Sequence, residues 1–197
     1  MNIYHVPWRP LRWLMRIRHR CGYGIHSPFA FGFVQSVVFE AGSFYAYPRL
    51  DALWAGARRE GQTRLRRKDV RLLFRLSNFA QARRGLFCGL DADGVALAAL
   101  REGCRKTHWS QRPEPGEKAG LIVLGEGWEP SAEMWLDAWA EGGTLVVFRP
   151  HRTAVAHRAW QALCRRKEAQ VWFDLYDFGI LFYKPQLQRQ GYLINYR

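Results

Sequence analysis

The chain has 197 residues, of which 48% are hydrophobic and 15% aromatic, and its formal net charge is +13. This length suits one domain with an N-terminal extension, and the apolar content excludes an intrinsically disordered protein. No apolar run is long enough to cross a bilayer, and the N-terminus lacks the apolar segment and cleavage site of a signal peptide. These features predict a cytoplasmic protein.

The positive charge is concentrated in the first part of the sequence. Residues 1–84 hold 16 basic and 4 acidic residues, whereas residues 85–197 hold 14 and 13. We therefore divide the chain into a basic helical N-terminal region, 1–84, and a following domain, 85–197. The asymmetry predicts an anionic partner, namely nucleic acid, a membrane surface or an acidic protein. The alternative is a bias of composition in which the charges are simply solvated.

The four cysteines do not form a recognisable site. They stand at positions 21, 88, 104 and 164, far from one another and from any pair of histidines. This spacing fits neither a zinc site nor a disulfide framework. We expect reduced thiols that serve as small apolar residues, and no bound metal.

Helices are expected to dominate the first 84 residues. Residues 10–20 predict a basic amphipathic helix that packs on its own domain or, alternatively, lies on a membrane interface. Ser27 and Pro28 are a good N-cap and first residue for a buried helix over 28–40. A further short helix is expected over 49–60.

Residues 62–80 predict a helix with a basic stripe beside an apolar face. The stripe consists of Arg64, Lys68, Arg71 and Arg75. Such a stripe is commonly a solvated side of a helix. It is also the best candidate in the sequence for contacts with phosphate groups.

From residue 85 onwards, short apolar runs alternate with helical patterns. We expect strands over 86–88, 121–124 and 144–148, a hairpin of 171–176 with 179–183, and a last strand over 192–196. Helices are expected over 95–100, 130–140 and 154–167, and a loop over 104–118. The alternation predicts an α/β fold with a mostly parallel sheet, covered on both faces and ending in an antiparallel hairpin.

Three segments carry a resemblance to a known family. Residues 24–29 read Gly-Ile-His-Ser-Pro-Phe, residues 121–127 read Leu-Ile-Val-Leu-Gly-Glu-Gly, and residues 173–184 match a terminal hairpin. Together they resemble a bacterial subgroup of proteins similar to class I S-adenosylmethionine-dependent methyltransferases. The resemblance implies a Rossmann-like methyltransferase fold, here in a reduced form and preceded by the N-terminal helices.

The resemblance also implies where a cofactor would bind. The methyltransferases place a glycine-rich turn after their first strand and use acids near that turn and after the second strand. The residues here that would form a reduced cofactor site are Gly89, Asp91, Gly94 and Glu126, of which Glu126 is adjacent to the position of a family aspartate, with His26 or His151 as a possible base. For the two histidines, structural positions at a helix start and in an exposed loop, respectively, are the favoured interpretation.

Several of the family's functional residues are replaced in this sequence. Cys88 stands where the family has a glutamate, and Gly125 where it has an aspartate. The family's Asp-Asp-Ile-His corresponds to Arg149-Pro-His-Arg152, which offers no carboxylate to a metal. The short interval between residues 88 and 121 implies that the family's second and third strands are absent, together with the acid that holds the ribose.

The sequence therefore predicts a catalytically degenerate methyltransferase-like module that binds an anionic partner, with nucleic acid favoured. An active, divergent S-adenosylmethionine-dependent methyltransferase is the alternative. A structural subunit is the third possibility, because the loss of outer strands would leave the first strand as an exposed sheet edge that a second copy of the chain could pair with.

Overall fold

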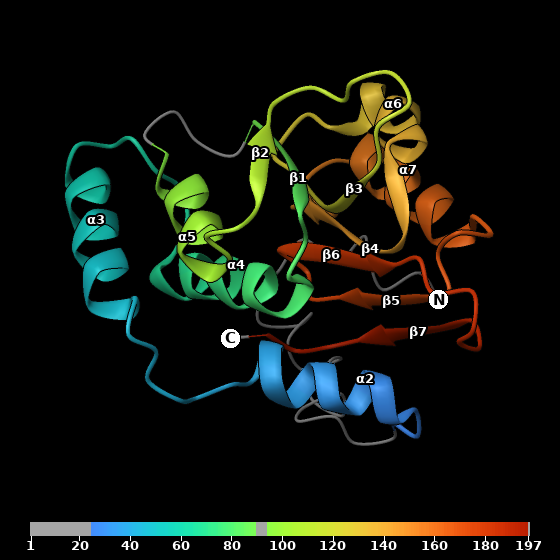
Figure 1. Cartoon of the computed structure of the whole chain (residues 1–197), viewed down its shortest axis with the longest axis horizontal. Coiled ribbons are helices and arrows are strands. Elements are labelled where there is room, and N and C mark those ends of the chain that lie inside the picture. Colours follow the sequence, from blue (N-terminus) through green and yellow to red (C-terminus); the bar gives the residue numbers. More distant parts are fainter. Residues whose placement is uncertain (1–24, 90–93, 197) are drawn as a thin grey trace.

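A computed structural model describes residues 25–89 and 94–196 (Figure 1). In these ranges seven strands form one sheet, in the order β2-β1-β3-β4-β6-β5-β7. The strands are β1 (Arg84–Cys88), β2 (His108–Ser110), β3 (Ala119–Leu124), β4 (Trp139–Phe148), β5 (Val171–Asp174), β6 (Phe178–Phe182) and β7 (Gln190–Leu193). The helices are α2 (Pro28–Phe33), α3 (Tyr47–Arg59), α4 (Arg67–Ala80), α5 (Val95–Gly103), α6 (Ala132–Asp137) and α7 (Ala154–Arg165), with short helical turns η3 (Val34–Val38) and η4 (Glu129–Ser131).

The strand directions confirm the predicted mixed α/β sheet. β2, β1, β3 and β4 are parallel neighbours, whereas β6 pairs antiparallel with both β4 and β5. β7 is parallel to β5. All strands except β6 therefore end at the same side of the sheet, where the turn between β5 and β6 also lies. We call this side the carboxyl end of the sheet.

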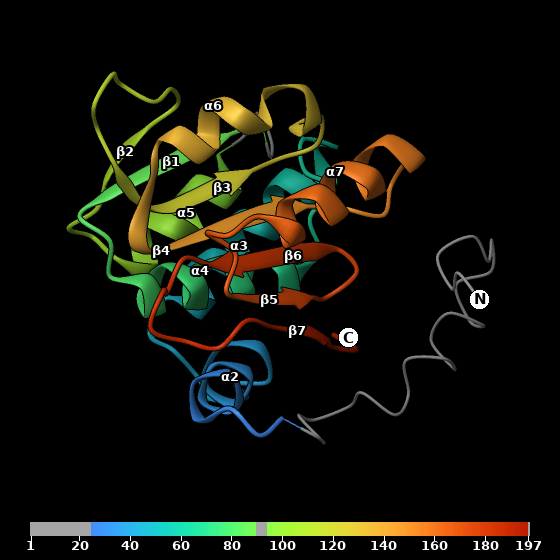
Figure 2. The same cartoon turned by 90° about the vertical axis from the view of Figure 1, so that its right-hand side faces the viewer.

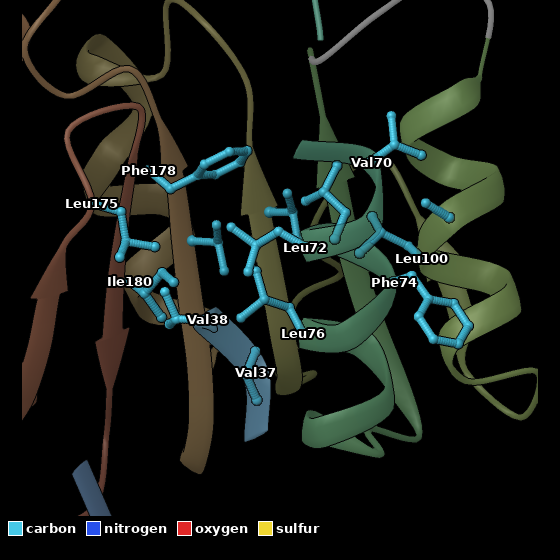
Figure 3. Close-up of a cluster of buried hydrophobic side chains, with 14 of the residues drawn as sticks. Val37, Val38, Val70, Leu72, Phe74, Leu76, Leu100, Leu175, Phe178 and Ile180 are labelled. Atoms are coloured by element: carbon cyan, nitrogen blue, oxygen red, sulfur yellow. The ribbon is translucent and has the colours of Figure 1, made fainter. Parts of the chain in front are cut away.

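Alternate residues of the strands build two hydrophobic cores, one on each face. Phe87, Val146 and Phe173 face the core that contains α2 to α5, and Leu145 and Leu181 face the core with α6 and α7. This alternation is the period of two that an extended strand imposes on its side chains. Helices accordingly cover both faces of the sheet (Figure 2). Figure 3 shows side chains of α4 and α5 meeting those of η3 and β6 in the first core.

The predicted helix start at Ser27 is confirmed. The Ser27 hydroxyl accepts a hydrogen bond from the backbone N–H of Ala30 at 3.3 Å, and Pro28 occupies the first turn. The helix continues as α2 and then as a π-helical turn, η3. Phe33 anchors it to the sheet, with ring centroids 4.7 Å from Phe173 and 4.9 Å from Phe182.

The predicted helix over 62–80 begins later than expected. Arg66 is extended, and its backbone N–H donates to the Asp69 carboxylate at 2.9 Å, so the helix α4 starts at Arg67. Asp69 also accepts hydrogen bonds from the Arg66 guanidinium, at 2.9 and 3.0 Å. A buried carboxylate at the start of a helix satisfies N–H groups that would otherwise have no partner.

The expected loop over 104–118 was wrong in part, because it contains the strand β2. His108–Ser110 has no apolar run, yet it pairs in parallel with Arg84–Leu86. The Trp109 ring lies where a side chain on Gly85 would stand, 2.6 Å from the position of its Cβ. The prediction that β1 is an exposed edge strand was therefore wrong, because β2 pairs with it. Pairing of two copies through the sheet would use β2 or β7.

The helix predicted over 130–140 was also too long. α6 ends at Asp137, and Trp139 belongs to β4, where it pairs with Ala119 of β3. The N–H of Ala119 donates to the Ala138 carbonyl at 2.7 Å, so pairing with β3 takes these residues out of the helix. The helix predicted over 10–20 lies outside the described residues. Within the described ranges, no helix is both long and apolar enough to span a membrane.

Candidate functional site

The carboxyl end of the sheet brings two of the predicted cofactor residues together. The N–H of Gly125, after β3, donates to the carbonyl of Cys88, the last residue of β1, at 2.6 Å. Gly89 follows with φ +67°, and a Cβ placed on it would lie 3.8 Å from the carbonyl oxygen of Glu126. Only glycine adopts such a backbone without strain, so the chain turns closely past Glu126.

Gly94 is the N-cap of α5, with φ +77° and nothing within 4 Å of a Cβ built on it. Both glycines therefore have a left-handed backbone conformation, which glycine adopts without strain. Asp91, the remaining predicted cofactor residue, lies outside the described residues.

The Glu126 carboxylate forms ion pairs with arginines. Arg149 Nη1 lies 2.8 Å from Oε1, Arg152 Nη1 lies 3.6 Å from Oε2, and Arg64 Nη1 lies 4.0 Å from Oε2. The Glu126 side chain is 22% exposed. We call Arg64, Arg149 and Arg152 the arginine cluster. Arg64 comes from the loop before α4, and the other two come from the loop after β4, which lies beside Glu126 because β3 and β4 are adjacent parallel strands.

His151 lies in the same loop as Arg149, and its predicted exposed position was wrong. Its side chain is 3% exposed, and Nε2 lies 2.7 Å from the Asp174 carboxylate at the end of β5. The His151 ring also stacks on Tyr176, with centroids 5.3 Å apart and planes 12° apart. A residue so enclosed holds the loop in place. His26, the other predicted base, is exposed immediately before α2.

The predicted basic stripe is divided among different environments. Arg75 is buried, and Arg71 is paired with Asp51 at 2.5 Å and lies 4.5 Å from the Tyr47 ring centroid. Lys68 donates to the carbonyl of Tyr196 at 3.0 Å. Arg64 alone of the four has a strongly exposed side chain, at 81%. The four residues therefore do not form one solvated face.

Arg66 connects the start of α4 with the carboxyl end of the sheet. Its Nη2 lies 2.5 Å from the Asp177 carboxylate in the turn between β5 and β6. Burial alone would lower the pKa of Arg66, but its hydrogen bonds and charge interactions with Asp69 and Asp177 raise it. This contact places the loop that carries Arg64 beside the loop that carries Arg149, whose N–H donates to the Asp177 carbonyl at 2.8 Å.

The described residues do not offer a metal site. No three His, Cys, Asp or Glu side chains among them are grouped so that they could hold a metal ion. Cys88, Cys104 and Cys164 are free thiols, of which Cys104 is buried like an apolar residue and Cys88 is exposed. Cys21 lies outside the described residues.

The fit to S-adenosylmethionine is incomplete. Gly89 and Gly94 carry no side chain that would hinder a ligand from approaching their backbone. However, the ammonium and ribose hydroxyls of the cofactor require acceptors, and the Glu126 carboxylate already accepts from arginine. At the end of β2, where the resemblance implies an acid, the chain has Ser110, whose hydroxyl donates to the Arg112 carbonyl at 3.0 Å. Gly89 and Gly94 therefore fit the cofactor, whereas Glu126 and Ser110 do not supply the acceptors that it needs.

Comparison with known proteins identifies the architecture. No protein-family model matches the sequence, and no curated protein matches it either. Among solved structures, SAH-bound methyltransferase PaMTH1 from Podospora anserina aligns with a TM-score of 0.56 and 11% identity, over 81% of this chain and 97% of that one. The chain has a methyltransferase-like fold. Cofactor-bound Rv0187 from MTB aligns with a TM-score of 0.54 and 15% identity, over 79% of this chain and 95% of that one.

Within the methyltransferase-like fold, sequence reasoning missed the arginine cluster. Arg149 and Arg152 were considered only as residues that replace the carboxylates of the family, and Arg64 was considered only as part of a helical stripe. The available signal was topological, since β3 and β4 are consecutive parallel strands and the residues after them must meet at the carboxyl end of the sheet. The role of Asp174 as the partner of His151 had no comparable signal.

Proposed function

We propose that this chain is a catalytically degenerate methyltransferase-like protein that serves as a binding module for an anionic partner, and that the partner is nucleic acid. One observation carries the proposal. The acid beside the glycine turn, Glu126, is paired with Arg149 and Arg152 at the place where the fold is expected to hold its cofactor.

This pairing works against methyl-transfer chemistry of the kind the resemblance implies. A sulfonium cofactor and a divalent cation both carry positive charge, and two guanidinium groups beside them would be repulsive. The same guanidinium groups favour an anion, because arginine donates two parallel hydrogen bonds to phosphate.

Nucleic acid is favoured among anions because the positive charge is large and extends beyond one site. The chain carries a net charge of +13, and nearly all of it comes from residues 1–84. Of the four residues predicted to contact anions, Arg64 is exposed, Lys68 and Arg71 are partly so, and Arg75 is buried. We therefore expect Arg64 to contribute directly to binding, and Arg75 to contribute only by stabilising the fold.

The experiment is fluorescence anisotropy with labelled single-stranded and duplex oligonucleotides at two salt concentrations. We expect binding at about 50 mM salt that weakens steeply toward about 200 mM, because cationic side chains displace counterions from phosphates. Absence of binding to either form of DNA or RNA at the lower concentration would refute the nucleic-acid proposal.

The second candidate function is an active S-adenosylmethionine-dependent methyltransferase. The observation in its favour is the close approach of Gly89 to Glu126, which with Asp91 and Gly94 would form a reduced cofactor site and leave His26 or His151 as a base. Isothermal titration calorimetry with S-adenosylmethionine and S-adenosylhomocysteine distinguishes the candidates. The degenerate module gives no binding heat with either compound, whereas the enzyme binds both.

A further inference from the structure

The arginine cluster holds more positive charge than its single carboxylate neutralises. Three guanidinium groups surround Glu126 at 2.8, 3.6 and 4.0 Å, which leaves an excess of two positive charges. The side chains of Arg149 and Arg152 are 39% and 42% exposed. Because a guanidinium group has five N–H donors and Glu126 engages few of them, the cluster has further donors that an anion could accept from.

The loop that carries two of these arginines is fixed on both sides. Arg149 has φ +50°, an uncommon conformation for a residue with a side chain, and its N–H is held by the Asp177 carbonyl. The N–H of Arg152 donates to the Arg149 carbonyl at 3.0 Å. Between them, the enclosed His151 is anchored to Asp174 at 2.7 Å. Backbone conformations of this kind persist where the surrounding structure imposes them, and they are frequent at binding sites.

The remaining contacts orient the arginines toward one point. Glu126 follows β3 directly, and its carboxylate receives Arg149 from the loop after β4 and faces Arg64 from the loop before α4. The three cationic groups therefore converge from two loops on the carboxyl end of the sheet, where ligands of open α/β sheets bind. An anion bound there would not require the loops to be reorganised, which lowers the cost of binding.

We propose that Arg64, Arg149 and Arg152 bind a phosphate group of the nucleic-acid backbone, with Glu126 holding the guanidinium groups in position and His151 acting as a positioning residue. The inference rests on the proposed function and adds the site at which it takes place. A polymer is favoured over a free nucleotide because Arg64 connects the cluster with the basic N-terminal region, which offers charge for further phosphates.

The test compares two double variants that are matched in charge and in contacts. R149Q/R152Q removes two of the arginines around Glu126. R49Q/R105Q is the control, because Arg49 and Arg105 lie 2.6 and 2.9 Å from one glutamate, Glu102, and both are largely exposed. Both variants lower the net charge by two, and circular dichroism verifies that each is folded.

We expect R149Q/R152Q to weaken binding of a labelled single-stranded oligonucleotide roughly tenfold at low salt, and to reduce the salt slope by about 0.7 for each phosphate group that the variant no longer binds. The control should be weakened much less. Equal effects in the two variants would overturn the site while leaving the proposed function intact. If the unmodified chain binds no nucleic acid at all, the proposed function is refuted, and the site that rests on it is refuted as well.

A competition arm identifies the source of the phosphate. Inorganic phosphate and a mononucleotide are added separately to the complex of the chain with labelled oligonucleotide. At equal concentrations of phosphate groups, we expect both to compete far more weakly than unlabelled oligonucleotide. Equal competition by the mononucleotide would overturn the assignment to a polymer.

The variant H151Q, which keeps both arginines, tests the role of His151. It should retain the salt slope and lose affinity, as expected for a positioning residue, and an unchanged affinity would refute that role.

Discussion

The Arg75 guanidinium of α4 caps the end of η3, with its Nε 2.5 Å from the carbonyl oxygen of Val37. It also donates to the Tyr47 hydroxyl at 2.8 Å, and the whole residue is buried. Carbonyl groups at the end of a helix have no partner within the helix, so a buried arginine here satisfies backbone groups and joins three elements.

Replacing Arg75 tests this structural role. Arg75→Met is expected to lower the free energy of unfolding by about 3 kcal/mol, because buried acceptors lose a charged donor. The measurement is chemical denaturation followed by circular dichroism. Arg67→Met, in the exposed first turn of α4, is the control and should change stability by less than about 0.5 kcal/mol. Equal stability of the two variants would contradict the assignment.

Gly103 sets the distance between α4 and α5. A Cβ at this position would lie 2.3 Å from the Phe74 carbonyl oxygen and 2.8 Å from the Ser77 Cβ. We expect Gly103→Ala to destabilise the protein by about 1–3 kcal/mol, since the helices must move apart. Gly56→Ala in α3 meets nothing within 4 Å and should stabilise by up to about 1 kcal/mol. The measurement is thermal melting of both variants. An unchanged melting temperature in Gly103→Ala would contradict the close packing of the two helices.

Glu126→Gln separates the two candidate functions. If the arginine cluster binds phosphate, Glu126→Gln should raise oligonucleotide affinity about fivefold, equivalent to about 1 kcal/mol, because it removes a negative charge that repels phosphate while its amide oxygen still accepts from Arg149 and keeps the guanidinium in position. If Glu126 instead serves a methyltransferase, the same change should abolish cofactor binding in calorimetry. Glu102→Gln is the control, because Glu102 also pairs with two arginines, and it should alter neither measurement. Reduced oligonucleotide affinity in Glu126→Gln would contradict the phosphate site.

Cys164 should react slowly with alkylating reagents. Burial raises the pKa of its thiol, and the charge of Asp174 adds to the shift. Less thiolate is therefore present at pH 8 than in a free cysteine, and labelling by iodoacetamide should accelerate with pH throughout the alkaline range. Cys88 is exposed and serves as the internal comparison. Peptide mass spectrometry after timed labelling measures both, and faster reaction at Cys164 would show that the site is open.

Local sequence signals predicted most of the fold because they act over short distances. Ser27 and Pro28 specify a helix start, and the hydrophobic runs at 121–124 and 144–148 specify buried strands whatever lies beside them. The hairpin after residue 171 was equally visible, since β5 and β6 are adjacent in sequence and in space. β2 was missed because its three residues form a strand only by pairing with β1.

The candidate site depended on arrangement in space. The sequence by itself determined a mixed α/β fold, with Gly89 after the first strand and Gly94 before the following helix. Only the tertiary structure decided that Arg64 and Arg149, 85 positions apart, converge on Glu126, and that Arg75 of the same stripe is buried. Helical periodicity tells which side chains share a face, whereas the partners of a charged side chain depend on which loops the sheet brings together.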